Sequence, residues 1–157
     1  MNLSDPSEPL VFETTSPAAT ILLGERLAQF LPAGMVVGFY GELGSGKTTL
    51  IKGFARGLGV KEMVKSPSFV IITEYQGRVP VYHIDLYRIH SPEEFIEIGL
   101  DSYLRADGVC LVEWAERAEQ LLPANAIRIY LSVTPAGRRI AILGLDPGLA
   151  EELKQTG

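Results

Sequence analysis

Residues 41–50, GELGSGKTTL, constrain this chain more than any other stretch, because few folds accommodate such a glycine-rich loop. The spacing G-x-x-x-x-G-K-[ST] is met by Gly41, Gly46, Lys47 and Thr48. The apolar run MVVGFY at 35–40 is typical of a buried parallel strand, and residues 48–57 have the apolar spacing of a helix. A strand, this loop and a helix in that order predict a phosphate-binding loop, and therefore a nucleotide site.

Each residue type in the loop has a chemical reason. Glycines let the backbone curl until successive N–H groups point inward at an anion, and the following helix adds its positive end. Lys47 supplies a point charge to the β- and γ-phosphates, and the Thr48 hydroxyl is a ligand for Mg²⁺. Nucleotide contacts are predicted from Gly41, Glu42, Leu43, Gly44, Ser45, Gly46, Lys47, Thr48 and Thr49. The string N-K-x-D, common in guanine-specific proteins, does not occur in the sequence, which favours ATP.

Two acidic residues stand at the ends of apolar strand candidates, where a phosphate-binding loop needs a partner for Mg²⁺. The run 109–112 leads into Glu113, and the run 81–84 leads into Asp85. We predict that Glu113 binds Mg²⁺ directly or through water, and that Asp85 orients the attacking water or holds a metal-bound water. Together with Thr48 they form the predicted metal site. The alternatives are a solvated carboxylate for Glu113 and a turn-forming residue for Asp85.

Three neighbouring residues have less specific interpretations. His83 shares a strand face with Asp85, and we expect a structural histidine there. Trp114 follows Glu113 and is predicted to pack or to face a partner protein. Cys110 lies in the apolar run GVCLV and is predicted to be a small core residue.

The remaining pattern predicts alternating strands and helices. Strands are predicted at 10–14, 35–40, 69–75, 79–87, 108–114, 126–133 and 138–145. Helices are predicted at 17–31, 48–57, 92–98, 115–122 and in the last ten residues. This order predicts an α/β fold, a three-layer sandwich like that of P-loop NTPases, with a mainly parallel central sheet and antiparallel hairpins added to it. Residues 1–157 are predicted to form one domain, with 1–9 as a loose lead-in.

Composition narrows the class of protein. The chain has 157 residues, 46% apolar residues and a net charge of −5, so it lacks the broad positive surface of an autonomous nucleic-acid binder. Its one cysteine forms no intrachain disulfide, which fits a reducing compartment. No run approaches the roughly 18–20 apolar residues that a membrane helix needs. We therefore expect a cytoplasmic protein without membrane contact.

Taken together, the motifs resemble the TsaE (YjeE) family of small bacterial P-loop ATPases. The matching segments are LLGERLAQFL, GELGSGKTTL, KSPSF, HIDLYRI, EEFIEIGLDSYL and LVEWAERAEQLLP. They occur in the family's order over most of residues 15–140. The phosphate loop alone specifies only a superfamily, whereas its combination with HIDLYR and VEW is far more specific.

The resemblance implies a role in the threonylcarbamoyl modification of adenosine 37 in tRNAs that read codons beginning with A. It implies work with TsaD and TsaB, on which ATP hydrolysis depends, and contact with tRNA only through that complex. The family's phosphate contacts fall on residues 42–48, its Mg²⁺ ligands on Thr48 and Glu113, and its catalytic residue on Asp85. KSPSF resembles the family's switch-like loop, which places Ser66 and Ser68 near the γ-phosphate; the family often has Thr at the second position. Contacts to the base or ribose would come from Ser16, Pro17 and Arg138.

Two other functions fit the phosphate loop. A small-molecule kinase would use the same loop and acidic strand end, but the chain has little room for an arginine-bearing lid. A non-hydrolysing adaptor would use ATP binding alone to dock its partner. Because the chain shows no obvious arginine finger, we expect slow intrinsic hydrolysis that a partner activates.

Overall fold

A seven-stranded sheet organises the chain, and the computed structural model describes residues 8–64 and 71–156 of it. The strands are β1 (Leu10–Thr14), β2 (Val36–Tyr40), β3 (Ile72–Gln76), β4 (Pro80–Asp85), β5 (Val109–Glu113), β6 (Ile127–Val133) and β7 (Arg138–Leu143). The helices are α1 (Pro17–Gln29), α2 (Lys47–Gly57), α3 (Pro92–Glu97), α4 (Leu100–Leu104), the 3-10 helix η1 (Ala115–Leu121) and α5 (Pro147–Thr156). Most of the predicted lead-in, residues 1–7, lies outside the described part.

The strand order β1-β7-β6-β2-β5-β4-β3 puts the parallel strands in the middle of the sheet. β6, β2, β5 and β4 pair in parallel, while β3 pairs with β4, β7 with β6 and β1 with β7 in antiparallel fashion. The predicted fold class is confirmed. Parallel pairing brings the carboxyl ends of β2, β4 and β5 to one edge, which is where an α/β sheet binds its ligand.

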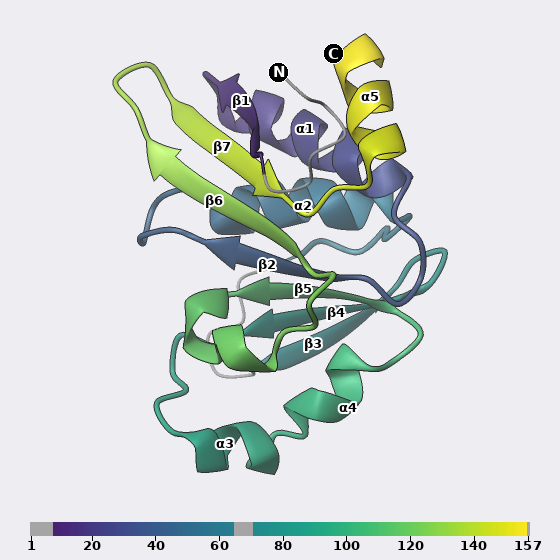
Figure 1. The fold of residues 1–157 in the computed structure, drawn as a ribbon, viewed down its shortest axis with the longest axis vertical. Helices are drawn as coiled ribbons and strands as arrows, with labels where there is room; N and C mark the ends of the chain where they lie inside the picture. The colour runs from purple at the N-terminus through teal and green to yellow at the C-terminus, as the bar shows by residue number, and fades with distance from the viewer. Residues whose placement is uncertain (1–7, 65–70, 157) are drawn as a thin grey trace.

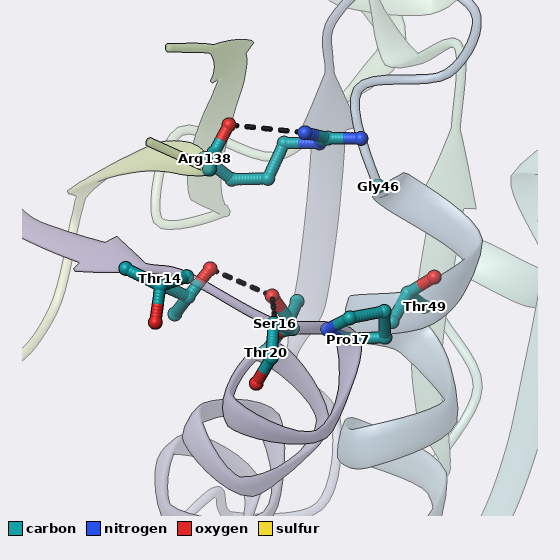
Figure 2. Close-up of a pocket in the computed structure, with 9 residues that line it drawn as sticks. Thr14, Ser16, Pro17, Thr20, Gly46, Thr49 and Arg138 are labelled. Atoms are coloured by element: carbon teal, nitrogen blue, oxygen red, sulfur yellow. Dashed lines mark hydrogen bonds between the residues drawn. The ribbon is translucent and has the colours of Figure 1, made fainter. Parts of the chain in front are cut away.

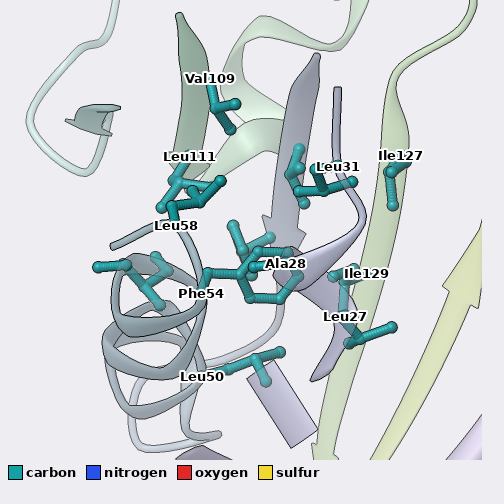
Figure 3. Close-up of a cluster of buried hydrophobic side chains, with 14 of the residues drawn as sticks. Leu27, Ala28, Leu31, Leu50, Phe54, Leu58, Val109, Leu111, Ile127 and Ile129 are labelled. Carbon is teal, nitrogen blue, oxygen red and sulfur yellow. The ribbon is translucent and has the colours of Figure 1, made fainter. Parts of the chain in front are cut away.

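Helices cover both faces of the sheet and complete three layers (Figure 1). One apolar cluster joins α1, α2 and α5 to one face, and we call this side the scaffold face. A second cluster joins α4 and η1, with α3 packed against it, to the other side, which we call the outer face. Figure 3 shows Phe54 of α2, and Leu58 directly after that helix, on the side of the sheet that carries Val109 and Leu111 of β5.

The two scaffold helices approach one another unusually closely. A Cβ placed on Gly53 of α2 would lie 2.2 Å from the carbonyl oxygen of Ile21 in α1. No side chain fits in that space, so the contact requires glycine. α2 is the helix that follows the phosphate loop, so this contact fixes where the loop begins.

Arg78, in the predicted turn between β3 and β4, caps both scaffold helices. Its guanidinium donates to the carbonyl oxygen of Gly57 at the end of α2, and to those of Ala28 and Leu31 at the end of α1, at distances of 3.1, 3.2 and 2.6 Å. Carbonyls at helix ends lack partners within the helix, and a cation there also complements the helix dipole. One side chain therefore ties two helices to the hairpin.

The sequence prediction was wrong in detail on the outer face. Ser91 precedes α3, but its hydroxyl donates to the Glu94 carboxylate (3.2 Å) and makes no cap to the helix, and the Glu94 amide bonds to the Ser91 carbonyl. The helix predicted at 115–122 is a 3-10 helix interrupted at Ala118, and α4 was not predicted as a separate helix. Cys110 is buried as expected.

Candidate nucleotide site

The predicted phosphate loop follows β2 and leads directly into α2. Gly46 is the residue before α2 and has a left-handed backbone with φ of 101°, a conformation that side chains strongly disfavour. The turn at Gly46 presents the N-terminal amides of α2 toward the loop, where they have no helical partner. An anion bound there would meet both these amides and the positive end of the helix.

Lys47 is buried at the start of α2, between the loop and an aromatic ring. Its ammonium donates to the carbonyl oxygen of Gly41 and lies 3.5 Å from the centre of the Trp114 ring. Burial lowers the pKa of Lys47, while the carboxylates of Glu116, Glu113 and Asp85 oppose that shift. A cation held between a carbonyl and a π face is partly desolvated, so a bound phosphate would be a strong partner for it.

Trp114 has a backbone conformation that the sequence does not predict. It is the one non-glycine residue with a left-handed backbone in the part of the chain that the structure describes, with φ of 57°. Strained backbone of this kind is costly in a bulky residue and clusters at functional sites. The turn that Trp114 makes after β5 places its ring against Lys47. The sequence predicted that Trp114 packs or faces a partner protein, and it did not predict this contact with the loop lysine.

Glu113 is the centre of the acidic half of the site, and it is buried at the end of β5. Its Oε1 accepts a hydrogen bond from the Thr48 hydroxyl at 3.0 Å, and its Oε2 lies 2.6 Å from Nε2 of His83. Because an ionised carboxylate only accepts hydrogen bonds, His83 donates through Nε2–H. Nδ1 of His83 is buried without a hydrogen-bond partner among the described residues, as suits the unprotonated nitrogen of that tautomer.

Asp85 lies directly opposite Glu113 in the register of β4 and β5. Its Oδ1 accepts a hydrogen bond from the backbone N–H of Tyr87 at 3.0 Å. Burial raises the pKa of Asp85, and the nearby Glu113 carboxylate raises it further. The two predicted acids therefore meet at one edge of the sheet, beside the first turn of α2, which carries Thr48.

The donor set of these three residues fits Mg²⁺. Thr48, Glu113 and Asp85 offer hydroxyl and carboxylate oxygens, the hard ligands that this ion prefers. In residues 8–64 and 71–156, no group of three or more His, Cys, Asp or Glu side chains is arranged to hold a metal ion unaided. A magnesium ion here would therefore need oxygen ligands from the nucleotide itself, which is its usual arrangement at phosphate sites.

A pocket of about 110 Å³ lies on the other side of the loop (Figure 2). It is lined by Thr14, Thr15, Ser16, Pro17, Thr20, Gly46, Thr49, Gly137 and Arg138. Ser16 caps α1, because its hydroxyl oxygen accepts a hydrogen bond from the Ala19 amide at 3.1 Å. The Arg138 guanidinium donates to the carbonyls of Gly44 (3.1 Å) and Gly137 (3.0 Å), so it holds the outside of the phosphate loop.

The structure brings together predicted residues from distant parts of the chain. Ser16, Pro17 and Arg138 share a pocket with Thr49, whereas Lys47, Thr48, Asp85 and Glu113 form the acidic and cationic side of the loop. Ser66 and Ser68, predicted near the γ-phosphate, lie outside the described residues. Sequence reasoning missed that Thr14 and Thr20 pair through their hydroxyls at 2.7 Å beside the pocket.

A comparison with protein families identifies the lineage of the chain. The family model described as threonylcarbamoyl adenosine biosynthesis protein TsaE matches residues 14–140. The chain belongs to the TsaE family. The resemblance inferred from the motifs is thereby confirmed, and the site described above lies within the matched residues.

Relatives of known name agree with this assignment. The TsaE protein of Bacillus subtilis is 44% identical over 123 residues, which are 78% of this chain and 77% of that protein. The TsaE protein of Treponema pallidum is 40% identical over 116 residues, covering 74% and 86%. The crystal structure of YdiB from Bacillus subtilis superimposes with a TM-score of 0.77 at 36% identity and covers 95% of this chain and 96% of that one.

The family is that of tRNA threonylcarbamoyladenosine biosynthesis, so the predicted place in tRNA modification is confirmed. Its members work in a shared pathway, which implies partner proteins within that pathway. None of the helices in the described residues of this TsaE-family chain is long and apolar enough to cross a membrane.

Proposed function

We propose that this chain is a Mg²⁺-dependent ATPase that serves the threonylcarbamoyl modification of tRNA adenosine 37 together with TsaD- and TsaB-like proteins. One observation carries the proposal: Glu113 bridges Thr48 and His83, at 3.0 and 2.6 Å, at the edge of the phosphate loop. A carboxylate fixed at both oxygens beside the loop hydroxyl is the arrangement that a magnesium–nucleotide site needs.

Each residue has a part in the proposed reaction, ATP + H₂O → ADP + phosphate. Lys47 and the loop amides bind the phosphate oxygens and stabilise the charge that develops on them. Mg²⁺, when bound by Thr48 and Glu113, supplies further positive charge to the phosphates. Asp85 orients the attacking water, and its raised pKa suits a group that accepts a proton. His83 holds Glu113 and thus acts through it.

Two cations beside the loop are already bonded to backbone carbonyls, and this supports the proposal that the isolated chain hydrolyses ATP slowly. Arg138 is bonded to the Gly44 and Gly137 carbonyls on the outer side of the loop, and Lys47 is bonded to Gly41. Phosphoryl transfer gains about 10³–10⁵ in rate from an arginine supplied at the transition state. We therefore propose that TsaD- and TsaB-like proteins complete the site, and that tRNA contacts those proteins.

The decisive experiment measures phosphate release by the purified chain with and without the TsaD- and TsaB-like proteins of the same organism, in Mg²⁺ and in EDTA. Expected are slow turnover alone, stimulation of at least tenfold by the pair, and none with Lys47→Ala. Turnover of many per second by the chain alone would contradict partner activation. ATP consumption that follows an added metabolite, with a phosphorylated product, would indicate a kinase. If Glu113→Ala still binds ATP and supports modification without hydrolysis, the chain is an adaptor.

A further inference from the structure

The 3-10 helix η1 packs directly on β2, the strand that leads into the phosphate loop. A Cβ placed on Gly38, in the middle of β2, would lie 3.0 Å from Cβ of Ala115 and 3.3 Å from Cδ1 of Leu122. Ala115 begins η1 and Leu122 directly follows it, so both ends of the helix approach this strand closely. Hydrogen bonds within a short 3-10 helix stabilise it little, so contacts of this kind decide where η1 lies.

At its start, η1 reaches the loop lysine through Trp114, the residue before the helix. The Trp114 ring lies 3.5 Å from Nζ of Lys47, and an ammonium over an indole face is attracted by the electrons of the ring. The ring of Tyr87 lies 5.1 Å from that of Trp114 and packs against it. The left-handed backbone of Trp114 is costly for so large a residue, and strain of this kind clusters at functional sites.

Near its end, η1 reaches the strand before the loop through Glu119. One oxygen of this carboxylate accepts a hydrogen bond from the hydroxyl of Tyr40, the last residue of β2, and the other accepts from Nε of Arg128 at 2.7 Å. Burial acts to raise the pKa of Glu119, but the hydrogen bonds from Tyr40 and Arg128 outweigh it and lower that pKa, so the carboxylate stays ionised at neutral pH. The Tyr40 ring also stacks on that of Tyr130 in β6, with centroids 4.6 Å apart. Tyr40 is therefore held at both its hydroxyl and its ring.

Tyr40 is followed directly by Gly41, whose carbonyl oxygen accepts a hydrogen bond from the ammonium of Lys47. A Cβ placed on Gly41 would lie 2.6 Å from the carbonyl oxygen of Leu131 and 2.6 Å from Oγ of Ser45, so this residue has little room to shift. The position of Tyr40 is thereby passed to the Gly41 carbonyl. Both contacts of the ammonium, the ring and the carbonyl, lead back to η1.

We infer that η1 positions the ammonium of Lys47 for the phosphates, with Trp114, Tyr40 and Glu119 as positioning residues that act through Lys47. The inference rests on the proposed function, in which Lys47 stabilises the charge that develops on the phosphates. A donor that is displaced loses more of its contact with the transition state than with the bound substrate. Loss of a positioning residue should therefore lower kcat and leave KM nearly unchanged.

Matched substitutions test each of the two contacts. Trp114→Phe keeps an aromatic face, whereas Trp114→Leu keeps only apolar bulk. Tyr40→Phe removes one hydroxyl, and Glu119→Gln keeps an oxygen that accepts a hydrogen bond but removes the charge. The controls are Tyr103→Phe on α4 and Phe30→Leu, an exposed aromatic residue directly after α1. Phosphate release is measured over a range of ATP concentrations with saturating TsaD- and TsaB-like proteins, and circular dichroism verifies that each variant is folded.

Trp114→Leu and Tyr40→Phe are each expected to lower kcat about tenfold, with KM within about twofold of its original value. Trp114→Phe and Glu119→Gln should lose less, and the controls nothing. Because both contacts act on one ammonium, the Trp114→Leu, Tyr40→Phe double variant should lose less than the product of the two single losses. If the unaltered chain hydrolyses ATP and both single variants keep its kcat, or raise KM alone, the inference fails while the proposed function stands.

A spectroscopic measurement tests the same contacts without hydrolysis. Trp114 is the one tryptophan of the chain, so the intrinsic fluorescence excited at the indole band reports on its surroundings directly. Lys47→Met removes the cation over the ring and should change the emission. Tyr40→Phe should change it in the same direction, and Tyr103→Phe should not. An emission that Tyr40→Phe leaves unaltered would show that the two contacts are not linked through Lys47, and would overturn the inference. If the unaltered chain hydrolyses ATP under no condition, the proposed function fails and the inference fails with it, whatever the emission shows.

Discussion

The two faces of the sheet are covered by helices of different length and packing. On the scaffold face, α1 has 13 residues and α2 has 11, and they meet at a glycine contact too close for any side chain. On the outer face, α3, α4 and η1 have 6, 5 and 7 residues, and large apolar side chains remain exposed. Short helices gain little stability on their own, and packing is what holds them.

This contrast bears on the support of the proposed nucleotide site. The residues proposed to bind phosphate and metal, Lys47, Thr48 and Glu113, are buried or lie next to buried positions on the scaffold face, and the same is true of His83, which holds Glu113. Preorganised electrostatic sites need such rigid support, because displacement of a donor weakens the transition-state contact. Exposed apolar side chains occur on both faces, for example Leu22 on α1 and Ile96 on α3, so the two faces differ in the length and packing of their helices. The following substitutions test this division.

The largest effect is expected at the contact between the scaffold helices. Gly53→Ala places a Cβ 2.2 Å from the Ile21 carbonyl oxygen and forces α1 and α2 apart. We expect it to lower the free energy of unfolding by about 3 kcal/mol, in the upper range of overpacking costs and despite the better helix propensity of Ala. Ile96→Ala on α3 should change stability by less than about 0.5 kcal/mol, as exposed positions do. Urea unfolding of the two variants checks the contrast, and similar losses would contradict it.

The two histidines of the chain lie on opposite faces and give the next test. His83→Ala removes the donor that fixes Glu113, so the Mg²⁺ concentration needed for half-maximal hydrolysis should rise about 10–100-fold, as for other residues that orient a metal ligand. His90→Ala, next to α3 on the outer face, should leave it unchanged. Magnesium titrations of phosphate release measure both. An unchanged magnesium requirement in His83→Ala would show that Glu113 needs no such support.

Thiol labelling compares how easily the two faces open. Burial raises the pKa of Cys110 to about 12, so its thiol reacts only when the outer layer opens. A Cys110→Ala, Ala55→Cys variant moves the thiol to a buried position on α2. With a chromogenic disulfide reagent, Cys110 should react about tenfold faster, because short helices open locally at lower free energy. Equal rates would mean that the whole domain opens as one unit.

The smallest effect concerns Asp85. Burial raises its pKa above the ordinary value of 3.8, so the ionised carboxylate destabilises the folded chain at neutral pH. Asp85→Asn keeps the acceptor for the Tyr87 amide and should raise the free energy of unfolding by about 0.5–1 kcal/mol at pH 7.5, while hydrolysis falls. The gain should shrink as the pH falls through the raised pKa, because the carboxyl is then neutral. Thermal unfolding at pH 7.5 and 4.5 checks both, and a gain independent of pH would exclude the charge as its cause.

Much of the scaffold face could be predicted from local sequence. The phosphate loop has fixed spacing, and the acids at 85 and 113 close apolar runs, so a sheet with parallel strands necessarily brings them together. The outer face was harder because its helices are short, and the number and type of turns there depend on tertiary contacts. α4 begins after Gly99 and η1 begins after Trp114, and both of these residues have a left-handed backbone conformation. Local sequence propensity predicts neither helix start.

Long-range side-chain contacts also escaped prediction. The pairing of His83 with Glu113 follows from strand register, which the sequence leaves open, and the contact of Trp114 with Lys47 follows from a strained turn. Arg78 looked like an ordinary turn residue, although it bonds to carbonyls 21 to 50 positions earlier in the chain. A single sequence contains no signal for such pairs.

The span of the Arg78 contacts has a kinetic consequence. They join helix ends to a hairpin that is synthesised much later, so they can form only after both scaffold helices and the hairpin have come together. Contacts made after the folding transition state leave the refolding rate unaltered and slow the unfolding rate. Arg78 would therefore act chiefly on the lifetime of the folded domain, which keeps the proposed ATP site assembled between encounters with its partners.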